Sequence, residues 1–205
     1  MLVKNNSMNP WETTALKEAI RAWVNMTDDD LLLISRFKTK TFAKGEFFNV
    51  NHSICRNLAF VSHGLFRIFY TDKKTGEDIN LFFFSENQFM VSFKSFITQT
   101  PCYYTIEALE DSEVSQISHS DLVGLFETSH AWESFGRVLA EQYFYFSQER
   151  TESFLFKTAE QRYKDLLQLY PTIFERVPLY HISSYLGIKG PSLSRIRKRL
   201  LQHKR

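Results

Sequence analysis

Residues 182–197 read ISSYLGIKGPSLSRIR, and this stretch has the spacing of a helix-turn-helix. Ile182 and Leu186, four residues apart, would form the inner face of a first helix. Leu193 and Ile196, three residues apart, would form the inner face of a second helix. Two short helices whose apolar faces meet predict a compact unit in the C-terminal part of the chain.

The residues between these two helices suit a tight turn. Gly187 can adopt the left-handed backbone conformation that such a turn needs, and glycine is favoured directly after a last helical turn. Ile188 can fill the space between the helices, and the small Ser183 lets them approach closely. The turn therefore favours a helix-turn-helix.

The second helix would expose hydroxyl and cationic side chains. Serine hydroxyls and a helix N-terminus suit phosphate oxygens, whereas Arg suits the paired acceptors of guanine in the major groove. The alternative is that a basic C-terminal helix is only a solvated face. The helix-turn-helix context favours double-stranded DNA, with Arg195 as base reader and phosphate contacts from Lys189, Ser192, Ser194, Arg197, Lys198 and Arg199.

The distribution of charge also indicates a polyanionic partner. Residues 157–205 carry 11 Lys or Arg and 3 Asp or Glu, a net charge of +8. Residues 1–156 carry 14 and 20, a net charge of −6. An acidic body joined to a basic C-terminal quarter suggests that this quarter meets a polyanion.

Composition limits the class of protein. The chain has 205 residues, 43% hydrophobic and 23% charged, so it can bury a core in one or two domains and is not fibrous or disordered. Two cysteines, Cys55 and Cys102, are too few for a disulfide scaffold and fit a reducing compartment. The longest apolar runs fall well short of the ~20 residues that span a bilayer. We expect a soluble, cytoplasmic protein.

Between residues 38 and 118 the pattern is that of short strands. Runs rich in β-branched and aromatic residues alternate with turn signals, which predicts an antiparallel barrel or sandwich. The clearest hairpin pairs residues 65–70 with residues 79–84. The predicted strand runs lie at 42, 47–50, 54–61, 65–71, 79–84, 89–91, 103–109 and 114–117.

Helical spacing flanks the strand region on both sides. Thr158 and Gln161 match a capping box, in which each side chain bonds the backbone N–H of the other residue, so a helix should begin here and run to about Tyr170. The other predicted helices cover 10–24, 31–37, 118–126 and 129–156.

The predicted helix 129–156 contains no Pro and carries an apolar and aromatic stripe. A helix this long often packs against its own copy, so we predict a homodimer. Simple packing on the barrel is the alternative. The residues predicted to meet the second copy are Phe135, Leu139, Gln142 and Phe146.

The chain from Phe37 to Lys198 resembles the CRP/FNR family of bacterial transcription regulators. The resemblance rests on the barrel pattern with turn glycines, the long helix, the Thr158 helix start and the residues 185–188 and 192–198. It implies an α+β fold with an N-terminal antiparallel β-roll, or double-stranded β-helix, of the cyclic-nucleotide-binding type. A dimerisation helix and a C-terminal winged helix-turn-helix would follow, and RNA polymerase would be a partner at promoters.

The resemblance implies three parts of the chain. Residues 1–128 would form the β-roll sensor domain with N-terminal helices, residues 129–157 the dimerisation helix, and residues 158–205 the helix-turn-helix domain. The family often has a polar or charged pair where this chain has Gly190 and Pro191. This departure predicts a different operator, or greater reliance on DNA shape.

The part of the family that binds cyclic AMP uses a Gly-Glu pair for the ribose and a later Arg for the phosphate. Here Val91 and Ser92 occupy the place of that pair, and no Arg lies between Arg67 and Arg137. A buried phosphate without a cation is costly, so cyclic-nucleotide binding is not expected.

The β-roll could instead hold an apolar effector. The hypothetical pocket residues are Phe82, Phe89, Val91, Ser92, Phe93, Tyr103 and Tyr104. The alternative is that these aromatic residues simply fill the barrel.

No cofactor, metal site or catalytic residue is expected. Residues 1–54 contain no Cys, so the N-terminal cysteine ligands of an iron–sulfur cluster are absent from the sequence. A cupin-like enzyme would need a His-x-His pair, and no two histidines here lie two apart. The remaining alternative is a ligand-binding or protein-interaction β-roll that does not bind specific DNA.

Overall fold

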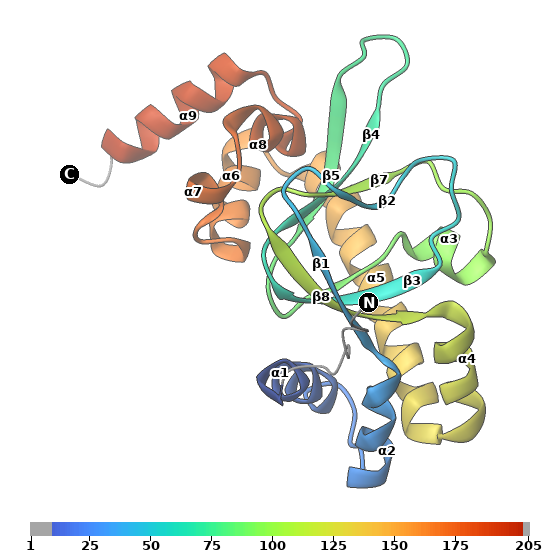
Figure 1. Cartoon of the computed structure of the whole chain (residues 1–205). Coiled ribbons are helices and arrows are strands. Elements are labelled where there is room, and N and C mark those ends of the chain that lie inside the picture. The colour runs from blue at the N-terminus through green and yellow to red at the C-terminus, as the bar shows by residue number, and fades with distance from the viewer. Residues whose placement is uncertain (1–9, 203–205) are drawn as a thin grey trace.

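The computed structural model describes residues 10–202, which form a β-roll, a long helix and a group of C-terminal helices (Figure 1). The two sheets are antiparallel, with strand orders β1-β8-β3-β6 and β2-β7-β4-β5. Non-consecutive strands are neighbours in both sheets, which is the topology of the predicted double-stranded β-helix. The strands are β1 (Lys38–Phe42), β2 (Phe47–Asn49), β3 (Asn57–His63), β4 (Phe66–Thr71), β5 (Asp78–Phe84), β6 (Phe89–Met90), β7 (Thr105–Ala108) and β8 (Ser112–Ser118).

The predicted hairpin is the pair β4 and β5. Its register runs from Phe66 opposite Phe84 to Thr71 opposite Asp78, and it projects from the roll beside the C-terminal helices (Figure 1). Strand β5 is at the edge of its sheet, so one row of its backbone groups has no strand partner among the described residues.

Helices cover the other end of the roll. The N-terminal elements are α1 (Pro10–Arg21), α2 (Asp28–Leu32) and a 3-10 turn at Leu33–Arg36, and they pack with α4 (His119–Thr128) and the start of α5 (His130–Phe156). Thr27 and Asp30 form a capping box that begins α2. A short helix that the sequence did not predict, α3 (Phe93–Thr98), follows β6.

The long helix α5 begins as predicted, with Ser129 as its cap. Its first half is part of the protomer's own core, where Trp132 and Phe135 pack against each other with ring centroids 5.5 Å apart. Phe135 and Leu139 are fully buried there, so they are unavailable to a second chain. This corrects the predicted dimer face, because the aromatic stripe in this half of the helix covers the roll.

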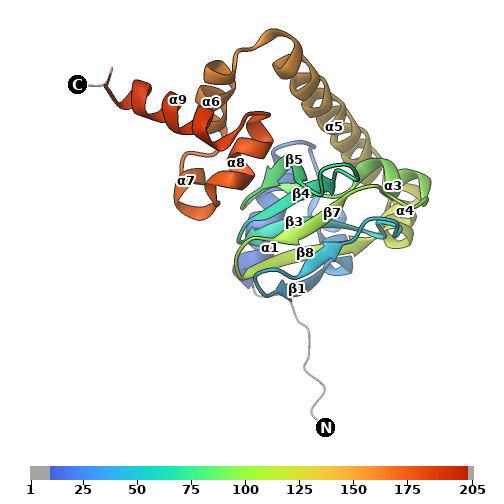
Figure 2. The same ribbon diagram turned by 90° about the horizontal axis from the view of Figure 1, so that it is seen from above.

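The second half of α5 extends past the roll toward the C-terminal helices (Figure 2). These are α6 (Ala159–Leu169), α7 (Ile173–Arg176), α8 (Leu179–Leu186) and α9 (Gly190–Gln202). The Thr158–Gln161 capping box at the start of α6 is confirmed. The described residues after Ser118 form helices and no strand, so a β wing is not seen among residues 119–202.

Within residues 10–202, no helix is both long enough and apolar enough to cross a membrane.

Candidate DNA-binding site

The helix-turn-helix consists of α8, a three-residue turn and α9. Gly187 ends α8 with a φ of 66°, and its N–H donates to the carbonyls of Ser183 and Ser184. A Cβ at this position would lie 2.6 Å from the Phe154 ring of α5. The turn therefore needs glycine both for its backbone conformation and for the close approach of α5.

The apolar pairs predicted from the sequence hold the two helices together. Ile182 and Leu186 of α8 are fully buried with Leu193 and Ile196 of α9, and Ile188 packs against the same cluster. Because these residues fix the inner side of α9, its opposite side faces outward (Figure 1). The exposed residues on that side are Pro191, Ser194, Arg195, Lys198 and Gln202.

The predicted DNA-binding residues divide into two groups. Ser194, Arg195 and Lys198 are exposed on the outer side of α9, with the half-buried Ser192 beside them. The Arg195 guanidinium lies 3.3 Å from the Ser192 hydroxyl, which it contacts as a donor. A surface depression at this point is lined by Ser192, Arg195, Ile196 and Arg199.

The other predicted cations contact the protein itself. Arg197 is half-buried, and its guanidinium stacks 4.7 Å from the Phe174 ring of α7. Arg199 forms an ion pair with Glu160 of α6. Lys189 lies 3.7 Å from Glu77 of the β4–β5 hairpin, at the surface. Arg197 therefore supports the fold of the unit, and the outer cationic side chains are Arg195 and Lys198.

Gln202 is not among the residues predicted from the sequence to contact DNA. It is exposed and follows Pro191, Arg195 and Lys198 at spacings of four, three and four residues. This helical period places Gln202 on the same side, and extending the period beyond Lys198 would have found it.

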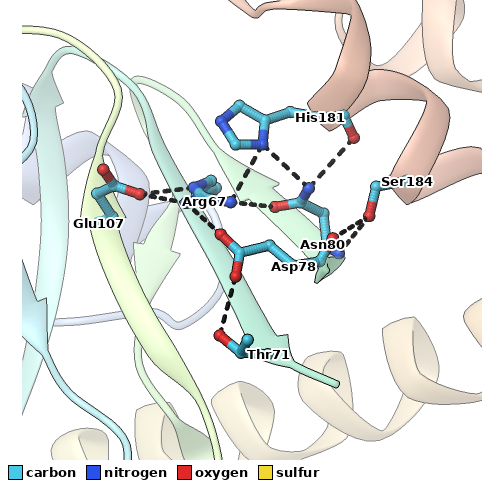
Figure 3. Close-up of polar contacts among 7 residues, drawn as sticks. All are labelled: Arg67, Thr71, Asp78, Asn80, Glu107, His181 and Ser184. Carbon is cyan, nitrogen blue, oxygen red and sulfur yellow. Dashed lines mark hydrogen bonds and ion pairs between the residues drawn. The ribbon is translucent and has the colours of Figure 1, made fainter. Parts of the chain in front are cut away.

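The position of this unit is set by polar contacts between α8 and the β-roll (Figure 3). Arg67 of β4 is 5% exposed, and its guanidinium pairs with Asp78 at 2.9 Å and with Glu107 at 2.6 Å. The same guanidinium lies 3.1 Å from Nδ1 of His181, on α8. A buried cation is thus neutralised by two carboxylates and directed at the helix-turn-helix.

Asn80 completes this cluster. Its side-chain amide lies 3.3 Å from both Nδ1 and the carbonyl oxygen of His181. Burial, followed by the nearby Arg67, lowers the pKa of His181 to about 4. The neutral imidazole can therefore accept the hydrogen bond that the Arg67 guanidinium donates.

A second contact lies at α7. Arg176 pairs with Glu86 at 2.8 Å and with Glu110 at 2.5 Å, both in turns of the roll. The hydrogen bonds that the Arg176 guanidinium donates to the carboxylates of Glu110 and Glu86 raise the pKa of Arg176 above its ordinary value. The C-terminal helices are therefore attached to the roll at two places, and a small cavity of about 140 Å³ beside Arg176 is lined by Leu65 and Tyr170.

The hypothetical effector residues do not all meet in one place among the described residues. Phe89 and Val91 are buried in the core that α5 covers, whereas Phe82 and Tyr104 pack against a different core cluster. Tyr103 is 73% exposed at the surface. These aromatic residues fill the roll or face solvent, which favours the alternative stated from the sequence.

The remaining two members lie at the start of α3. Ser92 is buried and precedes this helix, while Phe93 stacks on Tyr143 of α5 with ring centroids 4.8 Å apart. The Arg67 guanidinium is already bound by Asp78 and Glu107, on the side of the roll that faces α8. Within the described residues, no group of three or more His, Cys, Asp or Glu side chains could hold a metal ion.

Comparisons with known proteins agree with this fold. Residues 39–129 match the family described as the cyclic nucleotide-binding domain. No curated protein matches the sequence. Among solved structures, FixK2 from Bradyrhizobium japonicum is similar with a TM-score of 0.69 and 15% identity, covering 82% of this chain and 86% of its own.

Two further structures are similar over most of their length. One, from Eubacterium rectale, is assigned to the CRP/FNR family of transcriptional regulators, with a TM-score of 0.67, 19% identity and coverage of 87% of this chain and 85% of its own. The other is the catabolite activator protein of Thermus thermophilus, with a TM-score of 0.56, 16% identity and coverage of 91% and 88%. At these identities the likeness concerns the fold, and for the fold the predicted resemblance is confirmed.

The buried His181 predicts a pH dependence of stability. Its folded pKa of about 4 lies below its ordinary 6.5, so as pH falls between these values the unfolded chain takes up a proton that the folded chain does not. The free energy of unfolding should therefore fall by up to about 3 kcal/mol across this interval from His181 alone. His181→Asn, whose amide oxygen can replace Nδ1 as acceptor, should lack that loss. Chemical unfolding of wild type and His181→Asn from pH 7 to pH 4 measures both free energies of unfolding. If the two proteins lose the same free energy as pH falls, the low pKa of folded His181 is contradicted.

Proposed function

Because the chain has the fold of CRP/FNR-type regulators, we propose that it is a homodimeric transcriptional regulator that binds specific double-stranded DNA. The observation that carries this proposal is the outer side of α9, where Ser194, Arg195 and Lys198 are exposed on a helix that α8 supports from beneath. No catalytic role is proposed.

The proposed DNA contact follows from the shape and charge of α9. An α-helix fits the major groove, and a guanidinium can bond two acceptors of guanine there. Arg195, near the start of the helix, is the proposed base reader, as in other helix-turn-helix proteins where the N-terminal part reaches the bases. Lys198, Ser194 and Ser192 are proposed to bind phosphates, with Lys189 and Arg199 at the margins and Arg197 excluded by its contact with Phe174.

The proposed dimer uses the second half of α5. Phe144 and Leu155 are 70% and 68% exposed and lie eleven residues apart, so they share one face of the helix. This face replaces the predicted face, whose members Phe135 and Leu139 are buried and whose Gln142 is half-buried. Phe146 is exposed, but it is two residues from Phe144 and therefore lies on nearly the opposite side of the helix. Two copies related by two-fold symmetry would present their α9 helices to successive major grooves about 34 Å apart.

The proposed regulator does not depend on a cyclic nucleotide. Val91 and Ser92 offer no charge to a ribose or a phosphate, and Arg67 is bound by two carboxylates. A cyclic phosphate would lose its hydration without gaining a cation. Any effector of this β-roll is therefore proposed to be a molecule of another class.

Two substitutions on α9 test the DNA contact. Arg195→Ala should weaken binding to the preferred site by about 1–3 kcal/mol and reduce sequence preference, because a base contact is lost. Lys198→Ala should weaken binding to all sequences similarly and reduce the salt slope by about 1, because a phosphate contact is lost. Titration of labelled duplexes at several salt concentrations measures both effects. Lys94→Ala, an exposed lysine of α3, is the control; equal affinity of wild type and Arg195→Ala would refute the base-reading role.

Charge placed on the exposed face of α5 tests the dimer. The double variant Phe144→Glu and Leu155→Glu should raise the dimer dissociation constant at least about 100-fold, because two carboxylates would be buried against apolar surface. Sedimentation at micromolar concentration measures this. Leu32→Glu is a matched control, since Leu32 has the same 68% exposure as Leu155 but lies on α2. A double variant that remains dimeric would place the interface elsewhere.

Calorimetry with cyclic AMP and cyclic GMP tests the β-roll. Neither should bind with a dissociation constant below about 1 mM, because the roll offers no charged partner to the phosphate. Micromolar affinity for either nucleotide would contradict the proposal that this β-roll does not bind cyclic nucleotides.

A further inference from the structure

Ser184 of α8 is bonded into the open edge of the β-roll. The backbone N–H of Asn80 donates to the Ser184 hydroxyl at 3.0 Å, and that hydroxyl donates to the carbonyl oxygen of Asp78 at 2.6 Å (Figure 3). These are groups of the edge strand β5. One side chain of the helix-turn-helix thus takes the place that a further strand would occupy.

The side chains around Ser184 make this contact directional. Asn80 is 1% exposed and His181 is 6% exposed, and each is bonded to the other and to Arg67. Rotating or sliding α8 along β5 would leave these buried polar groups without partners, which is costly. The contact therefore specifies one orientation of α8 on the roll, whereas an apolar contact would tolerate several.

The long helix α5 meets the same point. Nη2 of Arg150 lies 2.5 Å from the carbonyl oxygen of Tyr185 and 3.3 Å from that of Asn80. The Arg150 guanidinium also stacks on the Tyr185 and Phe154 rings at 3.9 and 4.4 Å. One residue of the helix proposed to form the dimer is thus bonded to both α8 and β5.

We propose that Asn80, Arg150 and Ser184 act as a clamp that sets the orientation of α9 relative to α5. This inference rests on the proposed function. Because α8 carries α9 through a shared apolar cluster, fixing α8 to both the roll and α5 fixes the direction of the recognition helix. In a dimer joined through α5, the clamp sets the separation of the two α9 helices and hence the spacing of the half-sites that can be bound together. Its members are positioning residues that do not touch DNA.

Two adjacent serines provide a matched pair of variants. Ser184→Ala, combined with Asn80→Ala, removes the hydroxyl that bridges α8 and β5 and the buried amide beside it. Ser183→Ala is the control, because its hydroxyl bonds the carbonyl oxygen of Tyr180 within α8 and does not reach the roll. Adding Arg176→Gln to the double variant also removes the ion pairs between α7 and the roll.

The first experiment measures DNA affinity against half-site spacing. Wild type and Ser183→Ala should lose about tenfold or more in affinity when the spacer of the preferred site is changed by about two base pairs. The clamp variant, which is the double variant Asn80→Ala and Ser184→Ala, should lose less than about threefold, while its affinity for an isolated half-site stays within about twofold of wild type. A clamp variant that keeps the full spacing preference overturns the proposal.

The second experiment needs no DNA, so it separates failure of the clamp from failure of the proposed function. Dyes are attached to cysteines introduced at Lys44 and Gln202, both exposed, while Cys55 and Cys102 are buried. The distance distribution between the dyes should be narrow in wild type and in Ser183→Ala, and broad in the clamp variant. If the distance distribution stays narrow both in the clamp variant and in the variant that also carries Arg176→Gln, the proposed clamp is overturned, even if DNA binding is confirmed. If wild type ignores DNA but the distributions differ as expected, the clamp stands and the proposed function fails.

Discussion

The apolar contact between α8 and α9 is the constraint on which the rest of the candidate site depends. Ile182 and Leu186 bury one side of α9 through Leu193 and Ile196, and Gly187 provides the turn that brings these pairs together. Because hydrophobic burial fixes the inner side of α9, Ser194, Arg195 and Lys198 on the opposite side are presented outward. The proposed DNA contact thus follows from packing on the opposite side of the same helix.

Electrostatics gives Arg67 and Arg195 different roles. Arg67 is buried and compensated by Asp78 and Glu107, so its charge is used inside the protein, to attach α8. Arg195 is exposed on a helix whose flanks are held by Arg197 on Phe174 and Arg199 with Glu160. A cation without a buried carboxylate partner at a convex surface can bind a polyanion, whereas a compensated cation cannot do so without breaking its ion pairs. The proposal that this β-roll does not bind a cyclic nucleotide rests in part on the same compensation of Arg67 by Asp78 and Glu107.

Local signals in the sequence predicted much of the fold. The capping box at Thr158, the left-handed Gly187 and the β4–β5 hairpin each depend on residues close together in the chain, and each lies where it was expected. Partners that are distant in sequence could not be predicted in this way. Periodicity showed that Phe135 and Leu139 face an apolar surface, but not that this surface is the protomer's own core. Likewise, nothing near Arg197 in the sequence indicates Phe174 as its partner, and nothing near His181 indicates Arg67. The composition of α9 does not depend on a β wing, so it could not predict whether strands accompany this helix.

The central claim is that two copies of α9, held at one separation, recognise two half-sites of duplex DNA. Selection from a pool of random duplexes with the full chain tests this most directly. The account predicts an enriched motif of two inverted half-sites with centres about 10 base pairs apart, or a multiple of that. A pool that remains random after repeated rounds at low salt would contradict it.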